Sequence, residues 1–305
     1  MQIAGSKFNL ALVKSFTIVG AGRAGGALAL ALIGAGFSLD ALIKGKPSLR
    51  SDLAKRLPPE TLILSLSDAT TISSDLLFIA VPDDQIKVVA ERLAASVQPG
   101  IVAFHLSGAI GSDTLNPIAD RGADIGSLHP LVSIADPISG VKTLRSGYFG
   151  IEGTDRARRI GSEIARKIGS GWFEITADKK PLYHTAAVLA AGHLVALLDA
   201  AFEVIERAID PDSPRFLLPL VKSVIENLEN TNTETSLTGP LARGDAKTVE
   251  RHLKALTSSF SANLANIYIS LAERSVEIAR RGGDSETLKS VEILEELNIA
   301  KRHLA

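Results

Sequence analysis

The stretch that decides the fold is Phe16-Thr-Ile-Val-Gly20-Ala21-Gly22-Arg23-Ala24-Gly25, which runs on into Gly-Ala-Leu-Ala-Leu-Ala-Leu. A β-branched run enters a Gly-x-Gly-x-x-Gly turn and a helix rich in Ala and Leu leaves it, which is typical of a dinucleotide-binding unit. We expect Gly20 to turn the chain sharply, Gly22 to let a pyrophosphate approach the backbone, and Gly25 to let the helix pack closely. The amides at the helix start then attract the phosphates.

Two other interpretations of this turn stay open at the level of sequence. The first is a tight strand-to-helix turn that binds no ligand. The second is a methyltransferase, in which the glycine turn is looser and the next strand usually ends in an acidic residue.

Composition excludes several classes of function. The 305 residues carry a formal net charge of −1, so no electrostatic field favours nucleic acid or an anionic membrane. The absence of cysteine excludes disulfides, thiolate metal sites and cysteine nucleophiles, and we expect no metal. We find no signal peptide in residues 1–15 and no apolar run near the roughly 20 residues that span a bilayer. These observations predict a cytoplasmic protein.

The first half of the chain alternates short apolar runs with helical patterns. This alternation predicts an α/β domain of Rossmann type with a doubly wound, mainly parallel sheet. The expected strands are residues 16–19, 38–43, 61–64, 76–80, 101–105, 124–128, 147–152 and 171–175. The expected helices between them are residues 22–36, 49–57, 84–95 and 154–168.

After about Asp178 the pattern is helical throughout. The expected helices are residues 183–209, 215–228, 246–256, 258–281 and 285–297. We therefore predict a Rossmann-like dinucleotide-binding domain over residues 1–178 and an all-α substrate and dimerisation domain over residues 179–305. The apolar faces of these helices exceed what a small bundle needs internally, which favours a homodimer formed through the helical domain.

The end of the second strand indicates which dinucleotide binds. NAD enzymes usually place an acid there to hold the ribose hydroxyls, whereas NADP enzymes place basic or hydroxyl groups there for the 2′-phosphate. Here the strand is followed by a cradle of Lys44, Lys46, Ser48 and Arg50. Asp40 is an NAD-type alternative, but it falls in mid-strand. We therefore favour NADP over NAD, with a solvated basic loop as the other interpretation.

Three segments are expected at the carboxyl edge of the sheet, where cofactors bind in doubly wound folds. Ala80-Val81-Pro82 leaves the fourth strand and would stiffen the rim of the cofactor site, and Asp83 or Asp84 suits a helix N-cap. Ser107-Gly108 leaves the next strand, where its hydroxyl suits a carboxamide or substrate oxygen. His129 follows the strand after that, and it can bind a carboxylate or relay a proton. Each of these segments also has a purely structural interpretation.

Two further segments carry candidates for the chemistry. Tyr183 and His184 open a long helix, and His184 can titrate near neutral pH, which makes it the preferred proton donor. Arg243 can grip a substrate carboxylate bidentately, and Asp245 most simply caps the next helix. The catalytic candidates are thus His184, His129, Ser107 and Arg243.

Several motifs together resemble one family, over nearly the whole chain after about residue 15. They are Gly20–Gly25, Ala80-Val-Pro-Asp83, His105-Leu-Ser-Gly108, Ser127-Leu-His-Pro-Leu131, Tyr183-His-Thr-Ala-Ala-Val188, Ala196-Leu-Leu-Asp-Ala200, Leu237-Thr-Gly-Pro-Leu-Ala-Arg-Gly-Asp245 and Thr248-Val-Glu-Arg-His-Leu253. The chain resembles the family with a Rossmann-like N-terminal domain and a helical C-terminal domain of unknown function, grouped with 6-phosphogluconate dehydrogenase-like and β-hydroxyacid dehydrogenase-like proteins. The resemblance implies an NADP-dependent oxidoreductase that usually dimerises through its helical domain, and it names no substrate.

The chain departs from this family pattern at three places. Many members have Ser-Arg where this chain has Lys44-Gly45, so positive charge is kept but the guanidinium is lost. Many have Asn-Tyr where this chain has Gly192-His193. In β-hydroxyacid dehydrogenases a helix lysine donates the proton, with an asparagine one turn later, and residues 183–198 contain neither. The resemblance therefore supplies no proton donor.

Two classes of function follow. One is an NADPH-dependent reductase of a small carboxylate-bearing keto acid or imine, with chemistry like that of ketopantoate reductase, prephenate dehydrogenase or pyrroline-carboxylate reductase. The other is a non-catalytic NADP-binding regulatory or scaffold dimer, motivated by the missing helix lysine.

Overall fold

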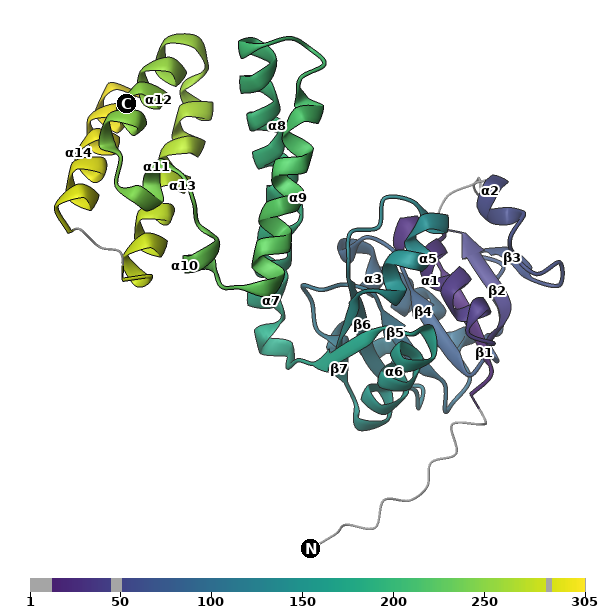
Figure 1. Ribbon diagram of the computed structural model, residues 1–305. Helices are drawn as coiled ribbons and strands as arrows, with labels where there is room; N and C mark the ends of the chain where they lie inside the picture. The colour runs from purple at the N-terminus through teal and green to yellow at the C-terminus, as the bar shows by residue number, and fades with distance from the viewer. Residues whose placement is uncertain (1–12, 45–50, 284–286, 305) are drawn as a thin grey trace, which may run out of the picture. The chain divides into compact units, whose positions relative to one another are not determined.

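The computed structural model describes residues 13–44, 51–283 and 287–304 (Figure 1). The chain divides into two compact units, residues 1–191 and 192–305. The boundary predicted after residue 178 lies one helix earlier, because helix α7 (Lys180–Ala190) is grouped with the first unit.

The first unit is built on one eight-stranded sheet, as the alternating pattern predicts. Its strands are β1 (Ser15–Val19), β2 (Ser38–Lys44), β3 (Leu62–Ser65), β4 (Leu76–Ile79), β5 (Val102–His105), β6 (Asp124–Leu131), β7 (Tyr148–Gly153) and β8 (Gly171–Glu174). The order across the sheet is β3-β2-β1-β4-β5-β6-β7-β8. Every neighbouring pair is parallel except β6 and β7. The first six strands follow the dinucleotide-binding order, with the switch point between β1 and β4.

Helices cover both faces of this sheet (Figure 1). One face packs against α1 (Arg23–Gly34), α5 (Pro137–Arg145) and α6 (Asp155–Ile168), around the fully buried rings of Phe16, Phe78 and Phe104. The other face packs against α3 (Asp83–Leu93) and the short α4 (Asn116–Ala119). The remaining short helix is α2 (Ser51–Ala54). Apolar burial on both faces explains why the central strands are continuous apolar runs.

Strand β6 is longer than the sequence predicts. We expected it to end at Leu128, but it continues to Leu131, which pairs with Tyr148 of the antiparallel β7. Ser127 and His129 therefore lie within a strand and not in an exit loop. Being two residues apart, their side chains point to the same face.

Over its described residues, 192–283 and 287–304, the second unit contains helices and no strand, as predicted. They are α8 (Gly192–Ala208), α9 (Pro214–Asn230), α10 (Thr233–Ser236), α11 (Pro240–Arg243), α12 (Ala246–Ser259), α13 (Ala262–Arg281) and α14 (Thr287–Leu304). The single helix expected over residues 183–209 is instead two, α7 and α8, separated at Ala191, whose φ and ψ are −118° and −70°. The core of the unit lies among α12, α13 and α14, where Val249, Ile269 and Leu297 are fully buried.

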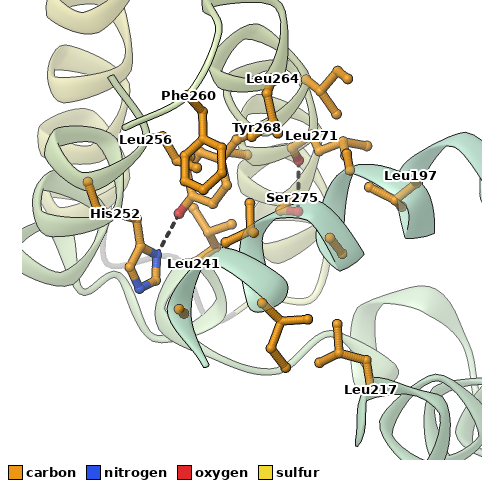
Figure 2. A pocket seen from close by; sticks show the side chains of 18 residues that line it. Leu197, Leu217, Leu241, His252, Leu256, Phe260, Leu264, Tyr268, Leu271 and Ser275 are labelled. Carbon is orange, nitrogen blue, oxygen red and sulfur yellow. Dashed lines mark hydrogen bonds between the residues drawn. The ribbon is translucent and has the colours of Figure 1, made fainter. Parts of the chain in front are cut away.

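Helices α8 and α9 are each 17 residues long and bury none of them. The long helices α12 and α13 of the same unit do bury apolar residues. A cavity of about 550 Å³ lies between α8 and the α12–α13 pair. Figure 2 shows its mainly apolar lining, to which Phe260 contributes a ring, and the hydrogen bond of 2.9 Å between His252 and Tyr268. By length and composition alone, residues 177–208 are apolar enough to cross a membrane. No such segment was expected from the sequence, and the break at Ala191 divides these residues between α7 and α8.

Candidate functional site

The glycine turn after β1 has the geometry that a dinucleotide requires. Gly20 has φ +94°, and a Cβ there would lie 2.3 Å from the carbonyl oxygen of Ala80. A Cβ on Gly25 would lie 2.1 Å from the carbonyl oxygen of Gly20. A Cβ on Gly22, by contrast, would meet nothing within 4 Å. Gly20 and Gly25 therefore permit close packing. Gly22 leaves open space at the start of α1, where the first backbone amides of the helix have no hydrogen-bond partner inside the helix.

The β4 exit lies beside this turn, at the switch point of the sheet. The amide of Ala80 donates to the carbonyl oxygen of Val19 at 2.7 Å, which ties Ala80 to the glycine turn. Pro82, not an aspartate, is the N-cap of α3, and Asp83 is the first residue of that helix. Asp83 therefore does not cap the helix, and its carboxylate is directed to another partner described below.

The basic segment after β2 is described only in part. Lys44 is the last residue of β2 and is partly exposed. Its charge lowers the pKa of Asp68, after the larger effect of hydrogen bonds from Ser65. Lys46, Ser48 and Arg50 lie outside the described residues, so the phosphate cradle stays a prediction. Asp40 lies in mid-strand, as expected.

Ser107 is held by a network at the exit of β5. Its hydroxyl donates to Asp83 Oδ2 at 2.7 Å and accepts from the amides of Ala109 and Ile110. The neighbouring His105 is fully buried. Burial, and then the charge of Lys180, lowers the pKa of His105 to about 3, so the ring is neutral. Its Nδ1 accepts from the Ser107 amide, and its Nε2 donates to the Gly111 carbonyl, both at 3.1 Å. His105 thus shapes this loop.

Lys180, the first residue of α7, lies under the same loop with 1% of its surface exposed. Its ammonium donates to the carbonyl oxygen of Ser107 at 2.9 Å and to Ser127 Oγ. Burial lowers the pKa of Lys180 to about 8, against the opposing charges of Glu152 and Asp83. Glu152 is itself engaged, because both its oxygens accept from Ser112 at 2.7 Å. The lysine therefore joins β5, β6 and α7.

His129 and Tyr183 form the part of this cluster that is partly open to solvent. His129 Nδ1 lies 2.6 Å from Tyr183 Oη. The imidazole of His184 packs edge-on against that of His129, with ring centroids 5.7 Å apart. Burial, followed by the charges of His184 and Lys180, lowers the pKa of His129 to about 4. Burial raises the pKa of Tyr183 to about 12.

Comparisons with known proteins match both halves of the chain. Residues 7–130 match the family model of a Rossmann-like domain, and residues 147–275 match the domain of unknown function DUF2520. The chain combines a Rossmann-like domain with a DUF2520 domain. The DUF2520 match begins at β7 and so includes Glu152, Lys180, Tyr183 and His184, whereas Ser107 and His129 belong to the Rossmann-like match. The polar cluster is therefore assembled from both.

Solved structures with this architecture cover most of the chain. Protein TM1727 from Thermotoga maritima is 25% identical with a TM-score of 0.68, over 87% of this chain and 98% of its own. A candidate NADP oxidoreductase from Bacteroides fragilis is 18% identical, with a TM-score of 0.73 and the same coverage. The pyrroline carboxylate reductase of Plasmodium falciparum, solved with NADP bound, is 13% identical with a TM-score of 0.56, over 88% of this chain and 98% of its own. The search of curated proteins returns no significant match.

The structure thus brings together three of the four catalytic candidates, Ser107, His129 and His184, within the first unit. The fourth, Arg243, ends α11 in the second unit, and its role stays a prediction. Asp245 is the N-cap of α12, as expected, and accepts from the Thr248 amide at 3.1 Å.

Lys180 was not predicted. The helix was expected to begin at Tyr183, so a helix lysine was expected only within residues 183–198, whereas α7 begins at Lys180. Pro181, at the first turn of α7, is a signal that could have located this helix start. Asp83 as the partner of Ser107, and Glu152 and His105 as members of the cluster, were not predicted either. Those contacts join residues far apart in sequence, and no local pattern predicts them.

Proposed function

We propose that this chain is an NADP(H)-dependent oxidoreductase that reduces a C=O or C=N group in a small molecule bearing a carboxylate. The observation that carries the proposal is the position of two features on one sheet. The open glycine turn lies at the carboxyl end of β1, and the cluster of titratable side chains lies at the carboxyl ends of β5 and β6. Hydride transfer needs a nicotinamide and a proton donor side by side.

Residues 20–25 would hold the cofactor pyrophosphate, and the reduced nicotinamide would supply the hydride. Lys44 supports NADP over NAD, because β2 ends in a cation where NAD enzymes usually place an acid. The NADP named for the two similar proteins above supports the same choice.

His129 and His184 are the side chains suited to proton delivery. Both are partly exposed, and they lie against each other. Lys180 is too deeply buried to meet a substrate, so we assign it a positioning role for the Ser107 and Ser127 segments. Arg243, in the second unit, stays the residue predicted to bind a substrate carboxylate.

The non-catalytic alternative was motivated by the absence of a helix lysine. That motivation is weakened, because His129 and His184 are partly exposed and offer proton delivery that needs no helix lysine. The reductase is therefore the better-supported function. We further propose that the chain forms a homodimer through α8 and α9, since neither helix buries a residue in the described chain.

The proposal is tested by cofactor binding and turnover in the same preparation. We expect NADPH to bind, and Gly22→Val to weaken it by about 10-fold or more, because the added side chain enters the open space meant for phosphate. NADPH oxidation is then followed across short 2-keto acids and cyclic imino acids. Tight NADPH binding without turnover of any substrate, together with no effect of His184→Ala, would contradict an enzymatic role.

A further inference from the structure

Two imidazole rings from different elements converge on Gly108. A Cβ built on Gly108 would lie 2.7 Å from His184 Nδ1 and 2.8 Å from His129 Nε2. His129 belongs to β6 and His184 to α7, so the convergence is made by the tertiary structure. Only glycine leaves room for both rings as they stand.

The hydrogen-bond partner of His129 determines where its proton lies. Tyr183 remains a phenol at neutral pH because its pKa is raised to about 12, and His129 remains neutral because its pKa is lowered to about 4. A phenol gives up its proton more readily than the N–H of a neutral imidazole does, so we take Tyr183 Oη as the donor and Nδ1 as the acceptor across the 2.6 Å contact. The proton of His129 is then on Nε2, the atom that faces Gly108 and His184.

The facing atom of His184 lacks a partner. His184 Nδ1 is buried and makes no hydrogen bond to any described residue. A buried nitrogen without a partner is uncommon in folded proteins, and a bound polar group is one way to satisfy it. The pair thus offers one N–H donor from His129 and one unused nitrogen from His184 at the same point.

We propose that His129 and His184 hold the oxygen of the group that is reduced, and that the substrate is therefore a ketone or an aldehyde and not an imine. This inference rests on the proposed function. A carbonyl oxygen accepts from His129 Nε2, and the hydroxyl it becomes can also donate to His184 Nδ1. An imine reacts as its protonated iminium, whose N–H could donate to His184 Nδ1 but whose nitrogen has no lone pair to accept from His129 Nε2. An iminium would therefore use one of the two rings, whereas a carbonyl oxygen and the hydroxyl it becomes use both.

The proton balance of the step follows from the same contacts. The carbonyl carbon would accept a hydride from NADPH as the C=O π bond breaks, and the oxygen would take the proton from His129 Nε2. Tyr183 Oη would pass its proton to Nδ1, so that His129 stays neutral. After product release, Tyr183 would take this proton back from Nδ1 while a proton from solvent restores Nε2–H, so the net proton consumed comes from solvent. Among the described residues, Lys180 on α7 acts electrostatically on His129, and His105 on β5 interacts with both. Glu152 on β7 and Asp83 on α3 in turn act on Lys180.

The tautomer is tested directly on the full-length protein. Long-range proton–nitrogen NMR of histidine-labelled protein, with His129 assigned by His129→Gln, should show its proton on Nε2. Tyr183→Phe removes the phenol that donates to Nδ1, so the proton of His129 should then be shared between Nδ1 and Nε2. A proton on Nδ1 in the unmodified protein would overturn the inference.

Turnover tests the choice of substrate. We expect NADPH oxidation with pyruvate or a longer 2-keto acid, and none with 1-pyrroline-5-carboxylate. Gly108→Ala should lower kcat/KM by about 100-fold, because its Cβ displaces the two rings, while NADPH affinity is unchanged. Gly34→Ala is the matched control, since a Cβ there meets only the Arg145 guanidinium at 3.6 Å.

Each remaining outcome has one meaning. Faster turnover of the cyclic imine overturns this inference and leaves the proposed function intact. NADPH binding without turnover of either series overturns both. If Gly108→Ala fails to fold, Tyr183→Phe replaces it, and an unchanged kcat in that variant counts against the inference.

Discussion

The two units of this chain differ in their side-chain burial: the first buries several polar side chains, and the second exposes several apolar ones. In the first unit His105, Ser127 and Lys180 are at most 1% exposed, and each is polar. In the second unit the apolar side chains of Val195 and Leu220 are 69% and 61% exposed. Buried polar groups that satisfy one another are typical of a functional site, and a contiguous exposed apolar face is typical of an interface. This contrast supports the two proposals made above, that the first unit carries the chemistry and that the exposed helices of the second unit form the homodimer.

The largest expected effect is on association. Leu220 and Val224 are four residues apart on α9, so they share one exposed face. Leu220→Glu combined with Val195→Glu should weaken self-association by about 2–4 kcal/mol, because it places charges in an apolar contact. Light scattering after gel filtration should show a dimer becoming a monomer.

The control for this change is Lys222→Glu, which alters an exposed charge on the opposite face of α9 and should leave the dimer intact. A native chain that is monomeric at every concentration would refute the proposed homodimer. It would also mean that the exposed face of α8 and α9 serves some other partner.

The next effect is on the pH dependence of the unfolding free energy, and it comes from the buried ammonium of Lys180. The pKa of Lys180 is lowered from 10.5 to about 8 on folding, so between these values the unfolded chain binds more protons. The buried Lys180 ammonium lowers the unfolding free energy by its full amount below about pH 8. This loss shrinks as the pH rises to 10.5, because the folded chain releases the proton first. Relative to Lys180→Met, which has no such proton, the native chain should gain about 3 kcal/mol of unfolding free energy across this interval.

Urea unfolding at several pH values measures this difference. Lys179→Met is the matched control, because Lys179 is exposed next to Lys180 and should leave the pH dependence as in the native chain. Parallel curves for the native chain and Lys180→Met would mean that the lysine is not held as a buried charge.

Local pattern was sufficient to predict most of the fold. The strands β1 and β4 are apolar runs ended by turns, and the predicted bounds differ from the observed ones by a single residue. The prediction failed where a tertiary contact decides the outcome. Pairing with β7 extends β6 beyond Leu128, and the break at Ala191 divides an apolar pattern that looks continuous.

The candidate site was predictable only in part, for the same reason. Ser107 follows β5 and His129 lies near the end of β6, so their position towards the carboxyl edge could be inferred from the order of elements. The role of Lys180 depends on the carbonyl of Ser107 and the hydroxyl of Ser127, which are 73 and 53 residues away in the sequence. Periodicity carries no information at such separations.

The smallest expected effect is on the affinity for NADPH relative to NADH, and it should leave self-association unchanged. Lys44→Glu should weaken NADPH by about 10-fold relative to NADH, or about 1.4 kcal/mol, because it replaces a cation by an anion beside the 2′-phosphate. Titration of both cofactors against the protein's fluorescence measures the ratio, and light scattering on the same samples should show unchanged assembly. Equal losses for NADPH and NADH would remove Lys44 from the 2′-phosphate site. If assembly also changed, the comparison between a first unit that binds and a second unit that associates would fail, because a residue on β2 would then act on both.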